Sequence, residues 1–159
     1  MAEMPSAGDN HGPSGLGFLL GVTHRERRRA WEAQLADLHI TAPQAALLRL
    51  VSGHPGRGIR QLARKLATDL MNVQRLADSL AHRQLLETRV DPADARRRPL
   101  YPTTAGQLLA VVITDRAIRA EKHLADQLGS DTYKVLLDGL TRLAHDDRQS
   151  QQSCEPPTT

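Results

Sequence analysis

Apolar residues recur with helical spacing in the middle of the chain. The spacing i, i+3, i+4, i+7 occurs twice in succession, first at Ile59, Leu62, Ala63 and Leu66 and then at Val73, Leu76, Ala77 and Leu80. Each set places one apolar stripe on a helix. The segment between the two stripes is short, and Thr68 or Asp69 is suited to cap the second helix. Two short amphipathic helices joined by such a turn are typical of a helix-turn-helix unit.

Two further helices are predicted before this unit. Residues 16–38 carry apolar positions on both sides of the basic stretch Arg25–Arg29, and we expect one helix there. A second helix follows, because Thr41 is a favourable N-cap and Pro43 suits a first turn. The run Gly53–Gly58 is rich in glycine and proline and ends it.

The hydrophobic spacing changes after Leu80. Residues 85–90 favour an extended strand, Asp91–Asp94 is typical of a turn, and Leu100–Tyr101 predicts a second strand. The connection between the strands carries consecutive arginines. A basic β-hairpin directly after a helix-turn-helix is a wing. The pattern therefore predicts a mainly α protein, a winged helix-turn-helix with a two-stranded β-wing and long N- and C-terminal dimerisation helices.

The C-terminal part predicts two long helices. One starts at Thr103 or Thr104 and runs to about Leu128; Ser130 is then suited to cap the last helix, which has an apolar stripe at Tyr133, Leu136, Leu137 and Leu140. A helix of roughly 25 residues spans nearly 40 Å, which is longer than a small winged domain. The apolar surface of the first, fifth and sixth helices therefore predicts a second subunit, and we expect a homodimer.

These elements give a single domain between two polar termini. The ends of the chain are rich in glycine, proline, serine and other small polar residues, which is typical of disorder. The expected division is a disordered segment at 1–15, one domain at 16–147 with a DNA-binding lobe at 41–103 and dimerisation helices at 16–38 and 104–147, and a disordered tail at 148–159.

The composition fits a cytoplasmic helical protein. Of the 159 residues, only 3% are aromatic and 25% are charged, so Leu, Ala and Val must form most of the core. The one cysteine, Cys154, cannot form an intramolecular disulfide, which suits a reducing compartment. No apolar run is long enough to span a membrane, and no signal peptide is evident. We expect no membrane association and no cofactor.

Several local motifs agree in order and spacing with one known family. They are Ile59–Ala63, Val73–Leu80, Asp91–Arg96 and Thr103–Gly106, and in the wing Asp94-x-Arg96 is followed by a threonine seven residues on and a glycine ten residues on. The stretch Ile40–Gly106 resembles the multiple-antibiotic-resistance regulator (MarR) family. The resemblance implies a dimeric transcription regulator that binds a pseudo-palindromic operator in double-stranded DNA, acts as a repressor and responds to a small effector.

This chain departs from the family pattern at several positions. His39 and Gln84 each stand where a glycine is common, and His39 lies at a helix end that favours a left-handed conformation. Pro102 replaces a leucine, and because it has no N–H we expect the second wing strand to stop there. Leu70 and Met71 occupy recognition-helix positions that are often polar.

The candidate DNA-binding residues lie on the recognition helix and the wing. When the apolar stripe of the helix faces inward, Asn72, Gln74, Arg75 and Ser79 lie on outward or flanking faces, where asparagine and glutamine can bind adenine and arginine can bind guanine or phosphate. For any one of them alone, a solvated polar residue on the helix surface is the favoured interpretation; the preceding helix-turn-helix pattern and the basic wing favour DNA contact. In the wing, Arg96 is placed to enter a minor groove with Asp94 bracing it, while Arg97 and Arg98 suit phosphates.

Two other functions stay open. A helical protein-interaction module that has lost DNA binding is favoured by Leu70, Met71 and Pro102. A metal-sensing regulator needs ligands gathered from several helices, because no two histidines are spaced i, i+4. No nucleophile elbow, phosphate-binding loop or carboxylate pair indicates an enzyme. The effector stays unidentified. The resemblance implies that it binds in a crevice between the dimerisation helices and the DNA-binding lobe, which Arg25–Arg29 and Trp31 could line, although Trp31 also suits the core.

Overall fold

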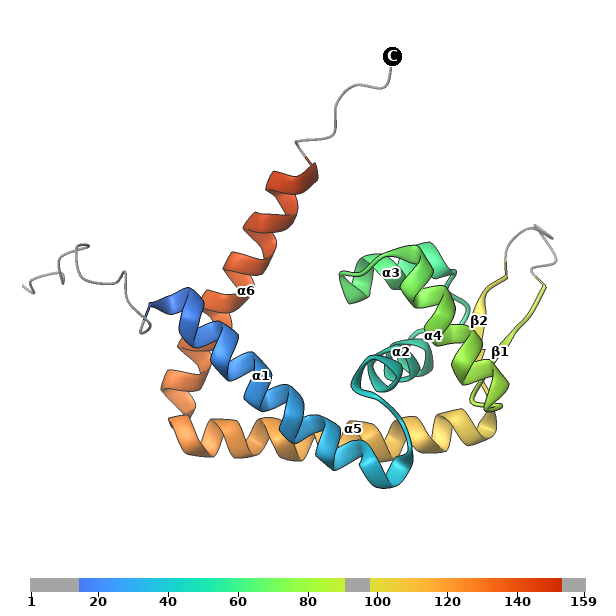
Figure 1. Ribbon diagram of the computed structural model, residues 1–159, viewed down its shortest axis with the longest axis horizontal. Helices are drawn as coiled ribbons and strands as arrows, with labels where there is room; N and C mark the ends of the chain where they lie inside the picture. The colour runs from blue at the N-terminus through green and yellow to red at the C-terminus, as the bar shows by residue number, and fades with distance from the viewer. Residues whose placement is uncertain (1–14, 91–97, 153–159) are drawn as a thin grey trace, which may run out of the picture. The chain divides into compact units, whose positions relative to one another are not determined.

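The computed structural model describes residues 15–90 and 98–152, with side chains as far as residue 144. The predicted mainly α winged helix-turn-helix fold is confirmed (Figure 1). The helical elements are α1 (Leu16–Leu35), the 3₁₀ turn η1 (Ala36–Leu38), α2 (Ala42–Gly53), α3 (Ile59–Leu66), α4 (Leu70–His82), α5 (Thr104–Leu128) and α6 (Ser130–Gln152). Strands β1 (Leu86–Thr88) and β2 (Leu100–Pro102) pair antiparallel.

The predicted helix starts of the central lobe are confirmed. Thr41 and Gln44 form a capping box, in which Gln44 Oε1 accepts from the Thr41 backbone N–H at 3.0 Å and Thr41 Oγ1 accepts from the Gln44 N–H at 3.5 Å. Asp69, one of the two candidates, caps α4 by accepting from the Asn72 N–H at 2.7 Å. Both helices begin where local side-chain chemistry satisfies their free N–H groups.

Within residues 15–90 and 98–152, three residues other than glycine adopt left-handed backbone conformations. The φ angles are 51° at His39, 50° at Ala67 and 57° at Gln84. His39 ends η1 in the conformation expected there, and Gln84 is the second of the positions where a glycine is common. The left-handed Ala67 at the end of α3 was not foreseen.

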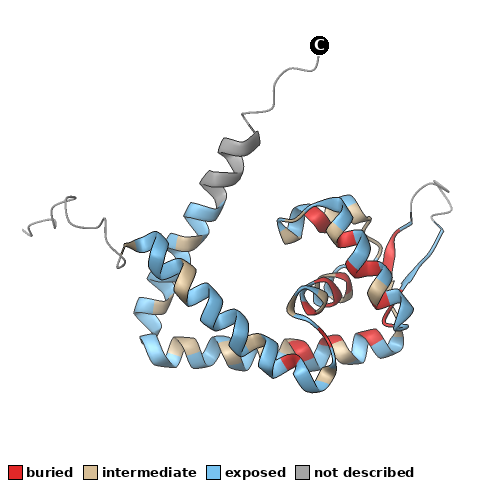
Figure 2. Cartoon of the chain, in the orientation of Figure 1, coloured by how far each residue is buried: buried red, intermediate tan, exposed pale blue. Residues whose placement is uncertain are grey.

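The buried core lies in the first of two compact units, residues 1–114 and 115–159. Figure 2 shows buried residues on α2, α3, α4, the hairpin and the first part of α5. The α3 stripe contributes its two central residues, Leu62 and Ala63, and the α4 stripe contributes all four of its residues. Trp31 is only partly buried against this core. The lobe therefore has its own hydrophobic interior.

The wing is attached to the loop between α2 and α3. In the hairpin Leu86 pairs with Pro102, and β2 stops there as expected. The Gly56 N–H donates to the Leu100 carbonyl at 2.9 Å, and the Leu100 N–H donates to the Arg57 carbonyl at 3.1 Å. The loop thus pairs with β2 through a short antiparallel bridge between Arg57 and Leu100. This bridge fixes the base of the hairpin against the helices.

The start of α5 packs unusually closely against the residues before β1. The Thr103 hydroxyl donates to the Gln84 carbonyl at 2.7 Å and accepts from the Gly106 N–H at 3.0 Å. A Cβ atom on Gly106 would lie 1.9 Å from the Leu85 carbonyl oxygen. Threonine and glycine at these two positions therefore lock α5 to the lobe.

The second unit exposes most of its side chains. None of the described residues after Ile113 is buried. Within this unit the Tyr133 hydroxyl of α6 donates to Glu121 of α5 at 2.5 Å, and this hydrogen bond, with a smaller contribution from desolvation and the Glu121 charge, raises the pKa of Tyr133. The unit therefore has little core of its own.

Two details of α6 differ from the sequence prediction. Ser130 is the first residue of the helix and not its cap, because the break falls at Gly129, whose φ is 78° and whose carbonyl accepts from the Tyr133 N–H. The helix also continues past residue 147 to Gln152. Across the described part of the chain, no helix is long and apolar enough to cross a membrane.

Candidate nucleic-acid interface

The recognition helix α4 has one buried and one exposed face. Val73, Leu76, Ala77 and Leu80 are buried, as the apolar stripe predicts. Gln74 and Arg75 are exposed, whereas Asn72 and Ser79 are half-buried. The four candidate residues therefore divide into two that point outward and two on a flank.

The side chains at the start of α4 hold one another in place. Asn72 Nδ2 donates to Thr68 Oγ1 at 3.0 Å, and Arg75 Nη2 donates to Asn72 Oδ1 at 2.9 Å. Gln74 Nε2 donates to Asp78 Oδ1 at 2.8 Å. Each bond uses only part of a side chain that has several donors or acceptors, so Asn72, Gln74 and Arg75 keep capacity for a further partner.

Ser79 has a different environment from the other three candidates. Its hydroxyl accepts from Gln44 Nε2 of α2 at 2.8 Å in a half-buried position. Gln44 is also the second member of the α2 capping box. Ser79 thus connects the recognition helix to the start of α2, and its contact with DNA stays a prediction.

Most of the predicted wing site lies outside the described residues. Asp94, Arg96 and Arg97 belong to the range 91–97, which the structure does not describe. Arg98 is described and exposed, and it lines a groove of about 720 Å³ together with Gln74, Arg60 and Arg64. The fold therefore brings one wing arginine to the same groove as a candidate residue of the recognition helix.

Arg60 and Arg64 of α3 were missed by the sequence prediction. Both are exposed, and among the described residues neither forms an ion pair with a carboxylate. Their proximity to Arg98 depends on how α3 and the wing pack, which no local spacing reveals. The available signal was regional charge: residues 39–114 hold 11 Lys or Arg against 5 Asp or Glu, whereas the whole chain is nearly balanced at 21 against 18.

Other arginines stabilise the lobe itself. Arg83 donates to the His39 carbonyl at 2.7 Å and so ties the end of α4 to the turn before α2. Arg89 lies 4.4 Å from the centre of the Tyr101 ring and pairs with Glu87 at 2.7 Å. These contacts account for two of the basic residues without any ligand.

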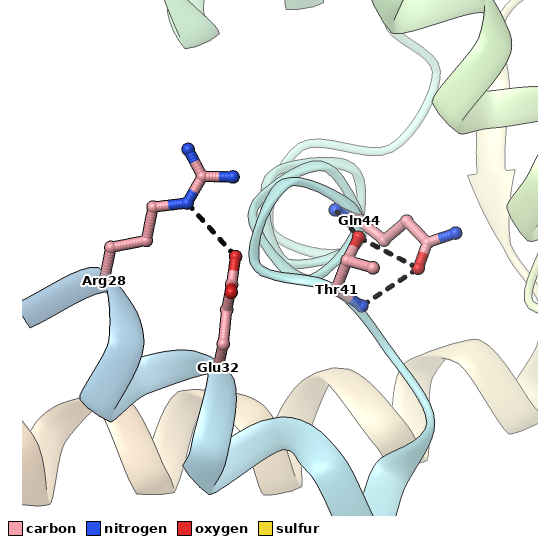
Figure 3. Close-up of polar contacts among 4 residues, drawn as sticks. All are labelled: Arg28, Glu32, Thr41 and Gln44. Atoms are coloured by element: carbon pink, nitrogen blue, oxygen red, sulfur yellow. Dashed lines mark hydrogen bonds and ion pairs between the residues drawn. The ribbon is translucent and has the colours of Figure 1, made fainter. Parts of the chain in front are cut away.

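A separate pocket of about 380 Å³ lies between α1, α2 and α4. Figure 3 shows Arg28 and Glu32 on α1 facing the start of α2, where Thr41 and Gln44 lie. Arg28 Nε donates to Glu32 Oε1 at 3.1 Å. Residues of the recognition helix complete the lining, which comprises Arg28, Glu32, Thr41, Pro43, Gln44, Arg75, Leu76 and Ser79.

In the described part of the chain, no three histidine, cysteine, aspartate or glutamate side chains lie together in a way that could hold a metal ion. The helix-turn-helix formed by α3 and α4 has one exposed face on its second helix, α4, with a basic groove beside it and a hairpin anchored to the lobe. These features define the class of winged helix-turn-helix proteins.

Comparison with known proteins identifies the family within this class. Residues 40–97 match the model of the MarR family. Rv2011c of Mycobacterium tuberculosis, an uncharacterized protein, is 33% identical over 117 residues, which cover 73% of this chain and 80% of that protein. The chain belongs to the MarR family of DNA-binding transcription regulators, which are not enzymes, and the predicted resemblance is confirmed.

Two solved structures show the same fold. The transcriptional repressor CouR, bound to a 23-mer DNA duplex, is 27% identical with a TM-score of 0.75 over 81% of this chain and 92% of CouR. The MepR–DNA complex of S. aureus is 23% identical with a TM-score of 0.77 over 82% of this chain and 96% of MepR. The predicted wing therefore belongs to an architecture that these relatives share.

Proposed function

We propose that the protein is a sequence-specific repressor that binds a pseudo-palindromic operator as a homodimer and is released from it by a small molecule. The observation that carries DNA recognition is the groove in which Gln74 of the recognition helix lies with Arg60, Arg64 and Arg98. A base-reading side chain beside several cations, of which Arg60 and Arg64 have no carboxylate partner among the described residues, is the combination that duplex DNA requires. The complexes of CouR and MepR with DNA support this proposal.

In this proposal α4 enters the major groove and the wing contacts the adjacent DNA. Arg75, Asn72 and Gln74 meet base edges, and Arg96 enters the minor groove with Asp94 bracing it. Arg97 and Arg98 contact phosphates, and Ser79 contributes from the flank of the helix. A gel-shift titration with the DNA upstream of the protein's own gene tests the proposal, since many repressors control their own expression. Failure to prefer that DNA over an unrelated duplex would favour the protein-interaction module.

Arg75→Ala is expected to change sequence preference. Arg75 is exposed and oriented by Asn72, and loss of a base contact of this kind costs about 1–3 kcal/mol for the preferred sequence. Binding to unrelated DNA should change much less. Affinities for the operator and for a scrambled duplex measure the difference. Equal weakening on both duplexes would assign Arg75 to a phosphate.

The protein is expected to be a dimer at micromolar concentration. Within the first unit α1 exposes Leu16, Phe18 and Leu19, and within the second Val135 and Leu137 of α6 are more than half exposed. Apolar surface of this extent is unusual on a stable monomer, and a second copy would cover it in a two-fold interface of more than about 2,000 Å². Light scattering measures the mass; a folded monomer would contradict both the dimer and the two half-sites.

The pocket between α1, α2 and α4 is the proposed effector site. Its volume of about 380 Å³ falls within the usual range for small ligands. Arg28 and Arg75 together outweigh the one carboxylate of the lining, Glu32, which pairs with Arg28, so the pocket keeps a net positive charge for an anionic molecule. Arg75 also belongs to the proposed DNA-reading surface. A ligand that draws Arg75 into the pocket would remove it from the operator, which explains release in physical terms.

Aromatic carboxylates are therefore expected to release the operator. Titration of benzoate derivatives against the protein–DNA complex gives the concentration for half-release. Arg28→Ala should raise that concentration about tenfold, as expected for the loss of one charged hydrogen bond. Arg29→Ala is the matched control, because Arg29 pairs with Glu26 at 3.3 Å and does not line the pocket. Equal responses of the two variants would rule out this pocket.

A further inference from the structure

The recognition helix begins with two apolar residues that the lobe does not bury. Leu70 and Met71 are the first residues of α4, and their exposed fractions are 46% and 83%. Single exposed apolar residues are common on protein surfaces. These two are consecutive and lie at the end of the helix that meets base edges in this class of protein.

Met71 lies on the same face as the candidate base-reading residues. It precedes Gln74 by three positions and Arg75 by four, so on an α-helix the three side chains share one side, opposite the buried stripe. Nothing about the stability of the lobe requires an apolar side chain there. The site therefore suits a ligand surface that presents an apolar group next to hydrogen-bonding groups.

Cations border the same apolar surface. Leu70 and Met71 line a broad open groove with Arg60 and Arg64, and Ala63 and Ala67 contribute to its floor. The Asp69 carboxylate at its edge caps α4 and is engaged with the Asn72 N–H. The groove therefore presents an apolar strip beside two arginines without carboxylate partners among the described residues.

We infer that Met71 reads the C5-methyl group of a thymine in the major groove of each operator half-site, with Leu70 extending the apolar strip beside it. This inference rests on the proposed DNA binding and makes it more specific. The thymine methyl group is the one apolar group that base edges present in the major groove, and it distinguishes T·A from the other pairs. The two arginines of α3 that border the strip match the phosphates that flank such a groove. An apolar protein partner would have no use for this positive border.

Replacement of thymine by uracil tests the inference, because uracil lacks the methyl group and keeps the Watson–Crick pairing. Wild-type protein should bind a duplex with uracil at one thymine of each half-site about 15-fold more weakly, since removing one methyl group from an apolar contact changes an equilibrium constant about fourfold. Uracil at thymines outside the protected half-sites should have no effect. Fluorescence anisotropy with both duplexes gives the ratio of dissociation constants.

Two matched variants assign the effect to Met71. Met71→Gln has a similar length but a polar end, and the variant should bind thymine and uracil duplexes equally. Met71→Leu stays apolar and should keep the discrimination. Both should fold normally, because the side chain is 83% exposed. Specific operator binding that ignores the methyl group, or discrimination that survives in Met71→Gln, would overturn this inference alone. If wild-type protein shows no operator preference on thymine DNA, the proposed function itself fails.

Discussion

Gly106→Ala should lower the free energy of unfolding by about 3 kcal/mol or more. The new Cβ would lie 1.9 Å from the Leu85 carbonyl oxygen and 2.9 Å from its carbonyl carbon, which are backbone atoms that cannot rotate away. Leu85 itself is buried in the core and its carbonyl also accepts from the Thr103 N–H at 3.1 Å. Alanine favours a helix over glycine by only about 1 kcal/mol, so the clash decides the sign.

Thermal and urea unfolding measure this effect. A loss of this size should lower the midpoint of thermal unfolding by about 10 °C in a chain of this length. Gly53→Ala is the matched control, because Gly53 ends α2 and a Cβ there would have no atom within 4 Å. That control should be as stable as the wild type or slightly more stable. A Gly106→Ala protein that unfolds with the control would show that α5 does not depend on this close contact.

Local chemistry was sufficient to predict the helices of the lobe. Thr41 and Asp69 cap α2 and α4 because each can accept a backbone N–H three residues on, and this depends only on neighbouring residues. The apolar stripe of α4 is buried because a spacing of i, i+3, i+4, i+7 leaves one face to pack. Fold class follows from such local rules when they agree along the chain.

The turn between α3 and α4 could not be predicted in the same way. Ala67 takes the left-handed conformation in which the Thr68 N–H donates to the Ala63 carbonyl at 3.1 Å. Glycine usually occupies this position at the end of a helix, since a Cβ costs about 1–2 kcal/mol there. The packing of α3 against α4 must offset that cost. An alanine in the sequence gives no indication that its backbone will be left-handed.

The candidate interface was predicted only where it follows the sequence of one helix. Gln74 and Arg75 are exposed because they alternate with the buried stripe of α4. Arg60 and Arg64 lie on α3, and they join Gln74 and Arg98 only through the angle between helices and the position of the wing. Ser79 was predicted as a DNA contact from its place on α4, but its hydroxyl bonds to Gln44 because α2 packs against α4. Tertiary geometry therefore decides which polar residues gather.

Operator affinity should fall about 10³- to 10⁵-fold between 50 and 200 mM salt. Each subunit offers four candidate phosphate-binding arginines, Arg60, Arg64, Arg97 and Arg98, so a dimer can make roughly six to eight phosphate contacts. Each contact releases condensed counterions from the duplex. The logarithm of the association constant therefore decreases with the logarithm of salt concentration, with a slope of about −0.9 for each phosphate.

Arg60→Ala should make that slope shallower by about two, because it removes one phosphate contact from each subunit of the dimer. Weakening should be equal on operator and scrambled DNA, which separates Arg60 from the base-reading Arg75. Arg142→Ala is the control, since Arg142 lies on α6 and pairs with Asp138 at 2.6 Å. Anisotropy titrations at several salt concentrations give the slopes. If Arg60→Ala and Arg142→Ala share the wild-type slope, Arg60 does not contact DNA, and the α3 side of the groove must be removed from the interface.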